Sequence, residues 1–407
     1  MSFSQLRQDV YSRNAPDDCC EQKFCISTVI FHIYRYKRCS FCQNVAQLIR
    51  ILQTGIMVSL RYISLLLCSL STIVMAKVPS IKLSSGYEMP VVGLGTWQLA
   101  PNDADKAITA ALESGYRHID TAFIYANEEA IGKSLKKWFD KGGKREDLFI
   151  TTKLSPISNR ASDVEKYMKL SLERLNLQYV DMFLIHVPMS FVKDPNKEAP
   201  AMNEDGSIVL DKTNDLVATW KEMEKQVKAG RTRSIGLSNF NESQIQRIVG
   251  SAEIQPSNLQ VELHAYMQQK PLRELCKKHN IAVTAYSTLG SPGASPDKKT
   301  DASKALPQLL KNPQVTKIAE SHKKTPAQVL LRHAVQSGVI VIPKSTNAAR
   351  IKANIDLFDF ELSDQEMKTM ESLDRGESGR IFNFLVFKGV ENHPEYPYTS
   401  QIPKKSS

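Results

Sequence analysis

Short apolar runs recur along residues 80–344 and alternate with segments in which apolar positions return every three or four residues. The runs predict buried strands, and the segments between them predict amphipathic helices. Ahead of the runs, residues 80–92 have the pattern of a β-hairpin that turns at Ser85-Gly86. Eight runs follow this hairpin: 91–95, 117–120, 148–153, 180–186, 233–238, 259–263, 282–287 and 338–344.

The helical segments at residues 103–115 and 163–176 are typical of those between the runs. The first is preceded by Pro101-Asn102, which predicts an Asn-type N-cap, and it ends at Gly115. Alternation of strands and helices predicts parallel pairing. Eight such units in about 280 residues fit one (β/α)8 barrel, a TIM barrel of the α/β class, better than two open sheets.

Two glycine-containing segments look like nucleotide-binding motifs but fail at one position each. Residues 93–98 have Gln98 where a dinucleotide-binding loop has its third glycine, and residues 127–134 have Asn127 where a P-loop has its first. A nicotinamide cofactor would therefore have to be held at the strand ends of the barrel.

The chain divides by composition into an extension, residues 1–76, and a main domain, residues 77–407. Six of the seven cysteines lie in the extension, which leaves Cys276 alone in the main domain. This usage predicts a domain that folds without disulfides in a reducing compartment.

The charge of the chain gives little support to nucleic-acid binding. The net charge is +10, and residues 1–76 contribute +4 of it with eight Lys or Arg and four Asp or Glu. The rest is spread over the main domain without a dense basic cluster. A modest basic bias suits an anionic ligand such as a phosphorylated cofactor, but it is also common in proteins that bind no such ligand.

Four polar side chains stand at or just after the ends of consecutive predicted strands. Asp120, Lys153 and His186 each end an apolar run, and Tyr125 follows the first of these runs. Barrels of this kind carry their active sites at the C-terminal ends of the strands, so the four can converge.

These four residue types suit the reduction of a carbonyl group. Tyr125 can protonate the carbonyl oxygen, and Lys153 is expected to lower the pKa of that tyrosine. Asp120 would hold Lys153 charged and oriented, and His186 would orient the substrate. The hydride must come from a cofactor, and no metal site is expected.

The segments GYRHIDTA, TTKL and LIH-x-P occur in this order around the four residues, and with them the chain resembles the aldo-keto reductase superfamily, especially its aldose and aldehyde reductases. The resemblance covers roughly residues 79–398. It implies a barrel with an N-terminal hairpin and a C-terminal substrate loop. It also implies a monomer that reduces aldehydes or ketones to alcohols, with NADPH as the cofactor and Tyr125 as the proton donor.

The resemblance also assigns a cofactor site. Residues that would contact NADPH are Thr96, Trp97, Asp120, Ser238, Asn239, Gln260, Tyr286, Ser287, Leu289, Ser291, Lys344, Ser345, Arg350 and Asn354. Within this set, Tyr286 would stack on the nicotinamide ring. Two cations and a hydroxyl, from Lys344, Arg350 and Ser345, suit a 2′-phosphate, which favours NADPH over NADH.

The substrate is left open. Trp97, Tyr125 and His186 would contact it, and the loop 188–215 and the tail from about residue 374 would complete its pocket. Val187 stands where the family often has Trp, Thr288 where it often has Pro, and Ala353 where a carboxylate often contacts adenine. Short aldehydes, sugars and ketosteroids all remain candidates.

Two other functions were weighed against carbonyl reduction. A non-catalytic NADPH-binding or structural protein can share the same barrel, although such proteins commonly lose a catalytic residue and all four are present here. A membrane-tethered subunit would follow if the apolar run 62–76 were an anchor, but its 15 residues fall short of the ~20 that span a bilayer.

The same run leaves the location of the protein open. Read from Met57, it is a secretory signal with cleavage after Ala76; a start at Met75 gives a cytoplasmic protein. We favour the cytoplasm, because the sequon at Asn241 directly follows residues that are expected to hold the nicotinamide. A glycan on Asn241 would crowd that site.

Overall fold

The computed structural model describes residues 78–294 and 299–401, and the expected boundary after residue 76 lies outside these ranges and stays a prediction. The strands are β1 Ser80–Lys82, β2 Glu88–Pro90, β3 Leu94–Gly95, β4 His118–Asp120, β5 Phe149–Leu154, β6 Val180–Ile185, β7 Thr232–Ser238, β8 Asn258–Glu262, β9 Ala282–Tyr286 and β10 Ile340–Val341. The helices are α4 Pro101–Glu113, α5 Glu128–Asp140, α6 Ala161–Leu175, α7 Leu216–Lys228, α8 Glu242–Ser251, α9 Lys270–Lys278, α10 Asp301–Lys304, α11 Pro313–His322, α12 Pro326–Gln336, α13 Ala348–Ile355 and α14 Asp364–Glu371.

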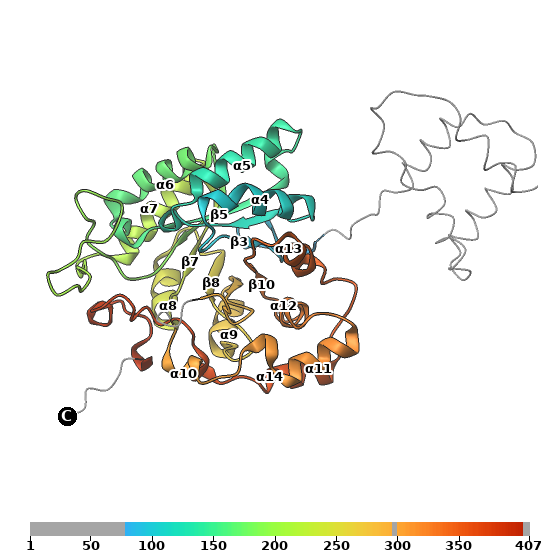
Figure 1. The fold of residues 1–407 in the computed structure, drawn as a ribbon. Helices are drawn as coiled ribbons and strands as arrows, with labels where there is room; N and C mark the ends of the chain where they lie inside the picture. Colours follow the sequence, from blue (N-terminus) through green and yellow to red (C-terminus); the bar gives the residue numbers. More distant parts are fainter. Residues whose placement is uncertain (1–77, 295–298, 402–407) are drawn as a thin grey trace, which may run out of the picture. The chain divides into compact units, whose positions relative to one another are not determined.

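Strands β3 to β10 form one sheet in sequence order, and every neighbouring pair is parallel. The two ends of the sheet meet, because Val92 pairs with Val341 and the amide of Gly93 donates to Val341 O at 2.8 Å. A side chain at Gly95 would overlap the carbonyl oxygen of Ile342, so glycine permits this close approach. Figure 1 shows the helices placed around the strands. The predicted (β/α)8 barrel is confirmed.

The N-terminal hairpin, β1 and β2, is also confirmed and closes the N-terminal end of the barrel. Its Leu83 and Met89 are buried against Phe149, Met182 and Leu184 from β5 and β6. These apolar contacts fill the barrel interior at the end opposite to that where the candidate polar residues end their strands.

The predicted N-cap of the first helix is wrong. Helix α4 begins at Pro101, and its N-cap is Ala100, which makes no side-chain hydrogen bond. Proline is favoured at the first helical position because its ring fixes φ and it lacks an N–H that would be left unpaired there. The predicted end is confirmed, since Gly115 follows the helix with φ of 95°.

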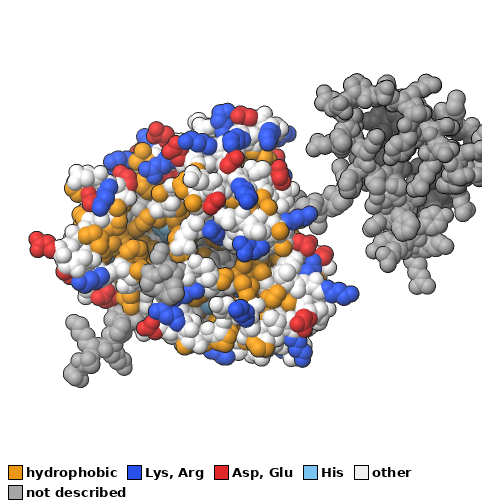
Figure 2. Space-filling view, viewed as in Figure 1, with side chains coloured by type: hydrophobic (Ala, Val, Ile, Leu, Met, Phe, Trp, Pro, Cys, Tyr) orange, Lys and Arg blue, Asp and Glu red, His pale blue; other side chains and the backbone are white. Residues whose placement is uncertain are grey.

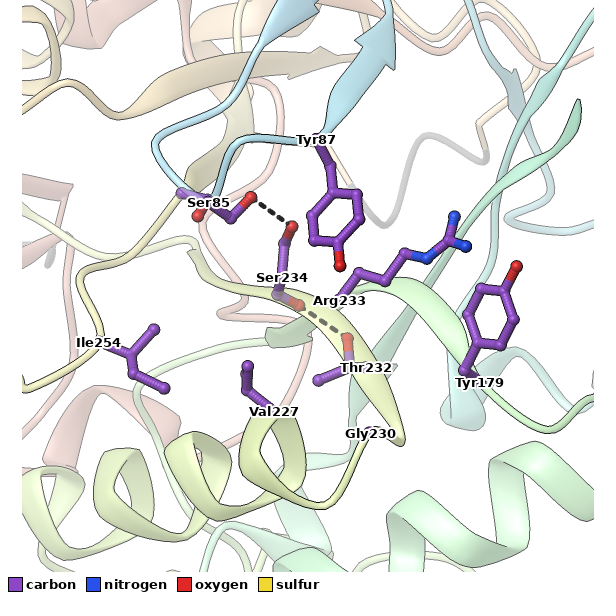
Figure 3. A pocket seen from close by; sticks show the side chains of 10 residues that line it. Ser85, Tyr87, Tyr179, Val227, Gly230, Thr232, Arg233, Ser234 and Ile254 are labelled. Carbon is purple, nitrogen blue, oxygen red and sulfur yellow. Dashed lines mark hydrogen bonds between the residues drawn. The ribbon is translucent and has the colours of Figure 1, made fainter. Parts of the chain in front are cut away.

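A hollow of about 440 Å³ lies beside the hairpin at the N-terminal end of the barrel (Figure 3). Ser85 Oγ lies 2.7 Å from Ser234 Oγ at its edge. The guanidinium of Arg233 lies over the rings of Tyr87 and Tyr179, at 5.2 and 4.3 Å from their centroids. The residues that line this hollow include none of the candidate site residues. None of the described helices is long and apolar enough to cross a membrane.

Candidate active site

The C-terminal ends of β4, β5 and β6 bring the four candidate catalytic residues together. Asp120 is the last residue of β4, and Tyr125 ends a short 3-10 turn, Phe123–Tyr125, that follows it. Lys153 is the next-to-last residue of β5, and His186 directly follows β6. Parallel pairing of β4 with β5 and of β5 with β6 places these strand ends side by side.

Lys153 links the other members of the group. Its Nζ donates to Asp120 Oδ1 at 2.6 Å and to the carbonyl oxygen of Thr121 at 2.9 Å. The same Nζ lies 3.5 Å from the hydroxyl of Tyr125. The side chains of Lys153 and Asp120 are 0% and 3% exposed, so water cannot replace any of these partners. The arrangement holds a positive charge beside a tyrosine hydroxyl.

The pKa of Tyr125 differs from the sequence-based expectation. Burial, and after it the charge of Asp120, raises the pKa of Tyr125 well above its usual value near 10. Burial also lowers the pKa of Lys153, against the effect of Asp120, which favours the charged form. The lowering of the Tyr125 pKa that was expected from Lys153 is therefore not found, because burial and the Asp120 charge both favour the neutral phenol. Tyr125 keeps its proton at neutral pH.

His186 faces Tyr125 and is neutral. The two rings pack edge to face with centroids 5.5 Å apart. Burial, and after it the charge of Lys153, holds the pKa of His186 well below 6.5. Its Nδ1 is buried without a hydrogen-bond partner among the described residues. Buried polar atoms are normally paired, so this imidazole has hydrogen-bonding capacity that a ligand could use.

The residues expected at the nicotinamide lie around the same group. Gln260 Nε2 donates to Asp120 Oδ2 at 2.7 Å, and Thr96 Oγ1 donates to Asp120 O at 2.9 Å. Asn239 Nδ2 donates to His186 O at 2.8 Å and to Ser238 Oγ at 3.0 Å. The structure thus places three of the predicted cofactor residues, Thr96, Asn239 and Gln260, in hydrogen-bond contact with the catalytic group, and Ser238 joins them through Asn239.

Tyr286 joins these residues from β9. Its hydroxyl donates to Asn239 Oδ1 at 2.7 Å, and burial raises the pKa of Tyr286 well above its usual value. Two further predicted residues, Ser287 and Ser291, both have positive φ and are hydrogen-bonded to each other at 2.8 Å. Leu289 packs against the apolar core. The loop after β9 is therefore held beside the site by its own hydrogen bond and by the packing of Leu289.

The predicted phosphate-binding residues form a second group after β10. Arg350 Nε donates to Ser345 Oγ at 3.3 Å, and both Arg350 and Lys344 are exposed. Asn354 is buried in α13. Among the described residues, no hydrogen bond or ion pair connects this group with Asp120, and its role at the cofactor phosphate stays a prediction.

Trp97, which was predicted to contact the substrate, lies shortly after β3 and packs against the C-terminal segment. Its ring packs edge to face on Phe382 with centroids 5.4 Å apart. The amides of Ile381 and Phe382 donate to the carboxylate of Glu262 at 2.5 and 2.9 Å. Glu262, at the end of β8, is fully buried and was missed by the sequence reasoning. An acidic residue inside the apolar run LQVEL was a signal that could have found it.

Asn127 was also missed. Its Nδ2 donates to Thr96 O at 2.9 Å, and its Oδ1 accepts from Thr121 Oγ1 at 2.9 Å. Thr121 O in turn accepts from Lys153. Asn127 thus holds Thr96, the residue before Trp97, and Thr121, whose carbonyl oxygen accepts from Lys153. Its place in a rejected P-loop pattern gave no sign of this.

The long loop 188–215 and the C-terminal segment pack against each other, and their role in a substrate pocket stays a prediction. The rings of Phe191 and Phe387 lie 6.2 Å apart, and the amide of Ile208 donates to Lys388 O at 3.0 Å. Val192, Met202, Val386 and Phe387 are large apolar residues that stay exposed on these two segments. Figure 2 shows apolar side chains gathered on the part of this face that the two segments occupy in Figure 1.

The chain matches the family model described as Aldo/keto reductase family over residues 91–375. It is 43% identical over 328 residues to Aldo-keto reductase family 1 member A1-A of Danio rerio, which covers 78% of this chain and 98% of that protein. It is 40% identical over 327 residues to Prostaglandin F synthase 1 of Bos taurus, covering 79% and 98% of the two chains. The solved structure of the aldose reductase from Schistosoma japonicum is similar, with a TM-score of 0.71, 40% identity and coverage of 79% of this chain and 99% of that chain.

Proposed function

The chain belongs to the aldo/keto reductase family of carbonyl-acting oxidoreductases, and we propose that it reduces aldehydes or ketones to alcohols with NADPH as the hydride donor. One observation carries the proposal: the buried chain of contacts from Asp120 through Lys153 to the Tyr125 hydroxyl. This arrangement matches the parts that carbonyl reduction needs at the substrate oxygen.

Tyr125 is the proposed proton donor. When bound, NADPH supplies a hydride to the carbonyl carbon, and the carbonyl oxygen gains negative charge. An alkoxide is a stronger base than a phenolate, so Tyr125 can protonate it even though burial raises the pKa of Tyr125. Lys153, 3.5 Å away, stabilises the phenolate that remains.

His186 and Asp120 are proposed to support this transfer in different ways. Neutral His186 can donate a hydrogen bond to the substrate carbonyl from its other ring nitrogen, Nε2, since Nδ1 is buried and its ring packs beside Tyr125. Asp120 accepts from both Lys153 and Gln260, which fixes the ammonium in place. Trp97, Tyr125 and His186 would then contact the substrate.

The residues fit a nicotinamide cofactor at two places. Gln260, Ser238 and Asn239 offer amide and hydroxyl groups beside the catalytic group, as a carboxamide requires, and Tyr286 offers an aromatic face. Arg350 and Lys344 are exposed cations beside the Ser345 hydroxyl, which suits the extra phosphate of NADPH. The remaining predicted contacts would lie between these two places.

We further propose that the protein works as a monomer in the cytoplasm. All of the candidate residues come from one chain. At the sequon, Asn241 Oδ1 caps α8 by accepting from the amide of Gln244 at 3.0 Å, and its Nδ2 donates to Pro397 O at 3.3 Å. A glycan on Nδ2 would displace Pro397, so a folded, glycosylated form is disfavoured.

The test is loss of NADPH absorbance in the presence of an aromatic aldehyde, an aldose or a ketosteroid, with NADH in parallel. Turnover that prefers NADPH is expected, and the ranking of the three substrates would name the substrate class. Tight NADPH binding without turnover on any carbonyl would favour a binding protein instead. Failure to bind NADPH would refute the roles given to Lys344 and Arg350.

A further inference from the structure

The side chain of Asn239 has every hydrogen-bonding position occupied by the protein itself. Its Nδ2 donates to His186 O and Ser238 Oγ, at 2.8 and 3.0 Å. Its Oδ1 accepts from the hydroxyls of Tyr286 and Tyr398, at 2.7 and 3.2 Å. An asparagine amide has two hydrogens and two lone pairs, so no position remains for a cofactor.

The orientation of this amide is fixed by its partners. A carbonyl oxygen can only accept, so the group that faces His186 O must be the amide nitrogen. Oδ1 therefore faces the two tyrosines, and both hydroxyls must donate. Burial raises the pKa of Tyr398 to about 12, so this hydroxyl keeps its proton at neutral pH and remains a donor.

Tyr398 reaches Asn239 from the C-terminal segment, 159 positions along the chain. The guanidinium of Arg380 lies 3.8 Å from the centroid of its ring, and the ring of Phe384 stacks on it at 5.7 Å. Before Tyr398, Glu395 pairs with Arg247 at 2.7 Å, which fastens the segment to α8. The ring contacts hold Tyr398 in place without help from its hydroxyl.

The two donors to Asn239 Oδ1 are not equal. The bond from Tyr286 is 2.7 Å long and comes from a barrel strand, whereas the bond from Tyr398 is 3.2 Å long and comes from the C-terminal segment. Hydrogen bonds between oxygen atoms are strongest near 2.7–2.8 Å. A ligand amide that needs Asn239 Oδ1 would therefore displace the hydroxyl of Tyr398 first.

We propose that Tyr398 and the carboxamide of the nicotinamide compete for Asn239 Oδ1, so that the C-terminal segment limits the affinity of this protein for its cofactor. The inference rests on the proposed function, which places the carboxamide at Ser238, Asn239 and Gln260. Ser238 accepts a bond from Asn239 and keeps its own hydrogen to donate, but the amide group of the carboxamide needs an acceptor. Asn239 Oδ1 can accept from that group only where the hydroxyl of Tyr398 no longer occupies it.

The test is the dissociation constant of NADPH for the full chain and for Tyr398→Phe. Phenylalanine keeps the ring that Arg380 and Phe384 contact and removes only the competing hydroxyl. We expect NADPH to bind about two- to tenfold more tightly, as the loss of one competing hydrogen bond predicts. The affinity for 2′-phospho-ADP-ribose, which lacks nicotinamide, should stay the same in both proteins.

Tyr396→Phe is the matched control. Tyr396 lies on the same segment, and its hydroxyl donates to Asn383 O at 2.6 Å rather than to Asn239, so its loss should leave NADPH affinity unchanged. Unchanged or weaker NADPH binding in Tyr398→Phe would overturn the inference and leave the proposed function intact. An unaltered chain that binds neither 2′-phospho-ADP-ribose nor NADPH would remove the proposed function as well.

Discussion

Lys153 Nζ lies 2.6 Å from Asp120 Oδ1 in a site where neither side chain meets water. The pair joins β4 to β5 at the end of the barrel that carries the candidate site. A buried ion pair contributes little net stability, because desolvation offsets the attraction, but removal of one partner leaves an uncompensated charge. The pair is therefore best explained by its contact with Tyr125, 3.5 Å from Lys153 Nζ.

Substitutions of the two members of this pair should not be additive. Lys153→Met and Asp120→Asn are each expected to lower the free energy of unfolding, by about 3 kcal/mol where a charge is left unpaired. The double variant should lose clearly less than the sum, since neither charge remains. Urea unfolding of the four proteins measures this coupling. Additive losses, to within about 0.5 kcal/mol, would show that the two residues do not act as a pair.

Tyr125→Phe should lower turnover by about 10²- to 10⁴-fold, because it removes the proton donor. NADPH affinity should hardly change, since the assigned cofactor contacts lie on other residues. Steady-state rates and cofactor titration measure the two effects separately. Tyr116→Phe is the control for turnover, because that buried hydroxyl donates to Ile351 O in α13 and makes no hydrogen bond to the four candidate catalytic residues. Turnover of Tyr125→Phe within about tenfold of the unaltered chain would assign the proton to another group.

Arg350→Ala should weaken NADPH binding by tenfold or more, as expected for the loss of a charge-assisted hydrogen bond of about 1.5–3 kcal/mol. NADH lacks the 2′-phosphate, so its KM should not move. Lys352→Ala, an exposed cation in the same helix α13, controls for a general loss of positive charge. Equal effects of Arg350→Ala on both cofactors would place the 2′-phosphate elsewhere.

The sequence predicted the barrel because each strand is a short apolar run that ends in turn residues or at a polar side chain. The sequence predicted the length of one strand poorly. The run 338–344 forms only the short strand β10, Ile340–Val341, because Pro343 has no N–H to donate to a neighbouring strand. The assumption that an asparagine caps α4 failed for a related reason, because Pro101 itself suits the first helical position.

The sequence could predict those residues of the candidate site that lie at the ends of strands. Asp120, Lys153 and Gln260 come together because β4, β5 and β8 end at the same side of the barrel. The contact of Tyr398 with Asn239 was not predictable, since no periodicity relates residues 159 positions apart. The pKa of Tyr125 could not be predicted either, because the balance between burial and the Lys153 charge depends on the folded environment.

Acid should unfold the protein partly through two histidines that are buried away from the candidate substrate contacts. Burial lowers the pKa of His118 and of His333 from 6.5 to about 4. Because the unfolded chain binds protons on these groups first, their contribution to stability is full above pH 6.5 and is lost as the pH falls toward 4. Each should lower the free energy of unfolding by about 2 kcal/mol between pH 7.5 and pH 5.

The variant His333→Leu isolates one of these contributions. His333 lies on α12 with its Nε2 buried and without a hydrogen-bond partner among the described residues, so leucine removes the titrating group from an apolar setting. Whatever the change at pH 7.5, the loss of stability between pH 7.5 and pH 5 should be about 2 kcal/mol smaller in the variant. Urea unfolding at the two pH values measures the difference. Parallel losses in the two proteins would mean that His333 binds its proton equally well in the folded and unfolded chains, and its burial would then have no effect on acid stability.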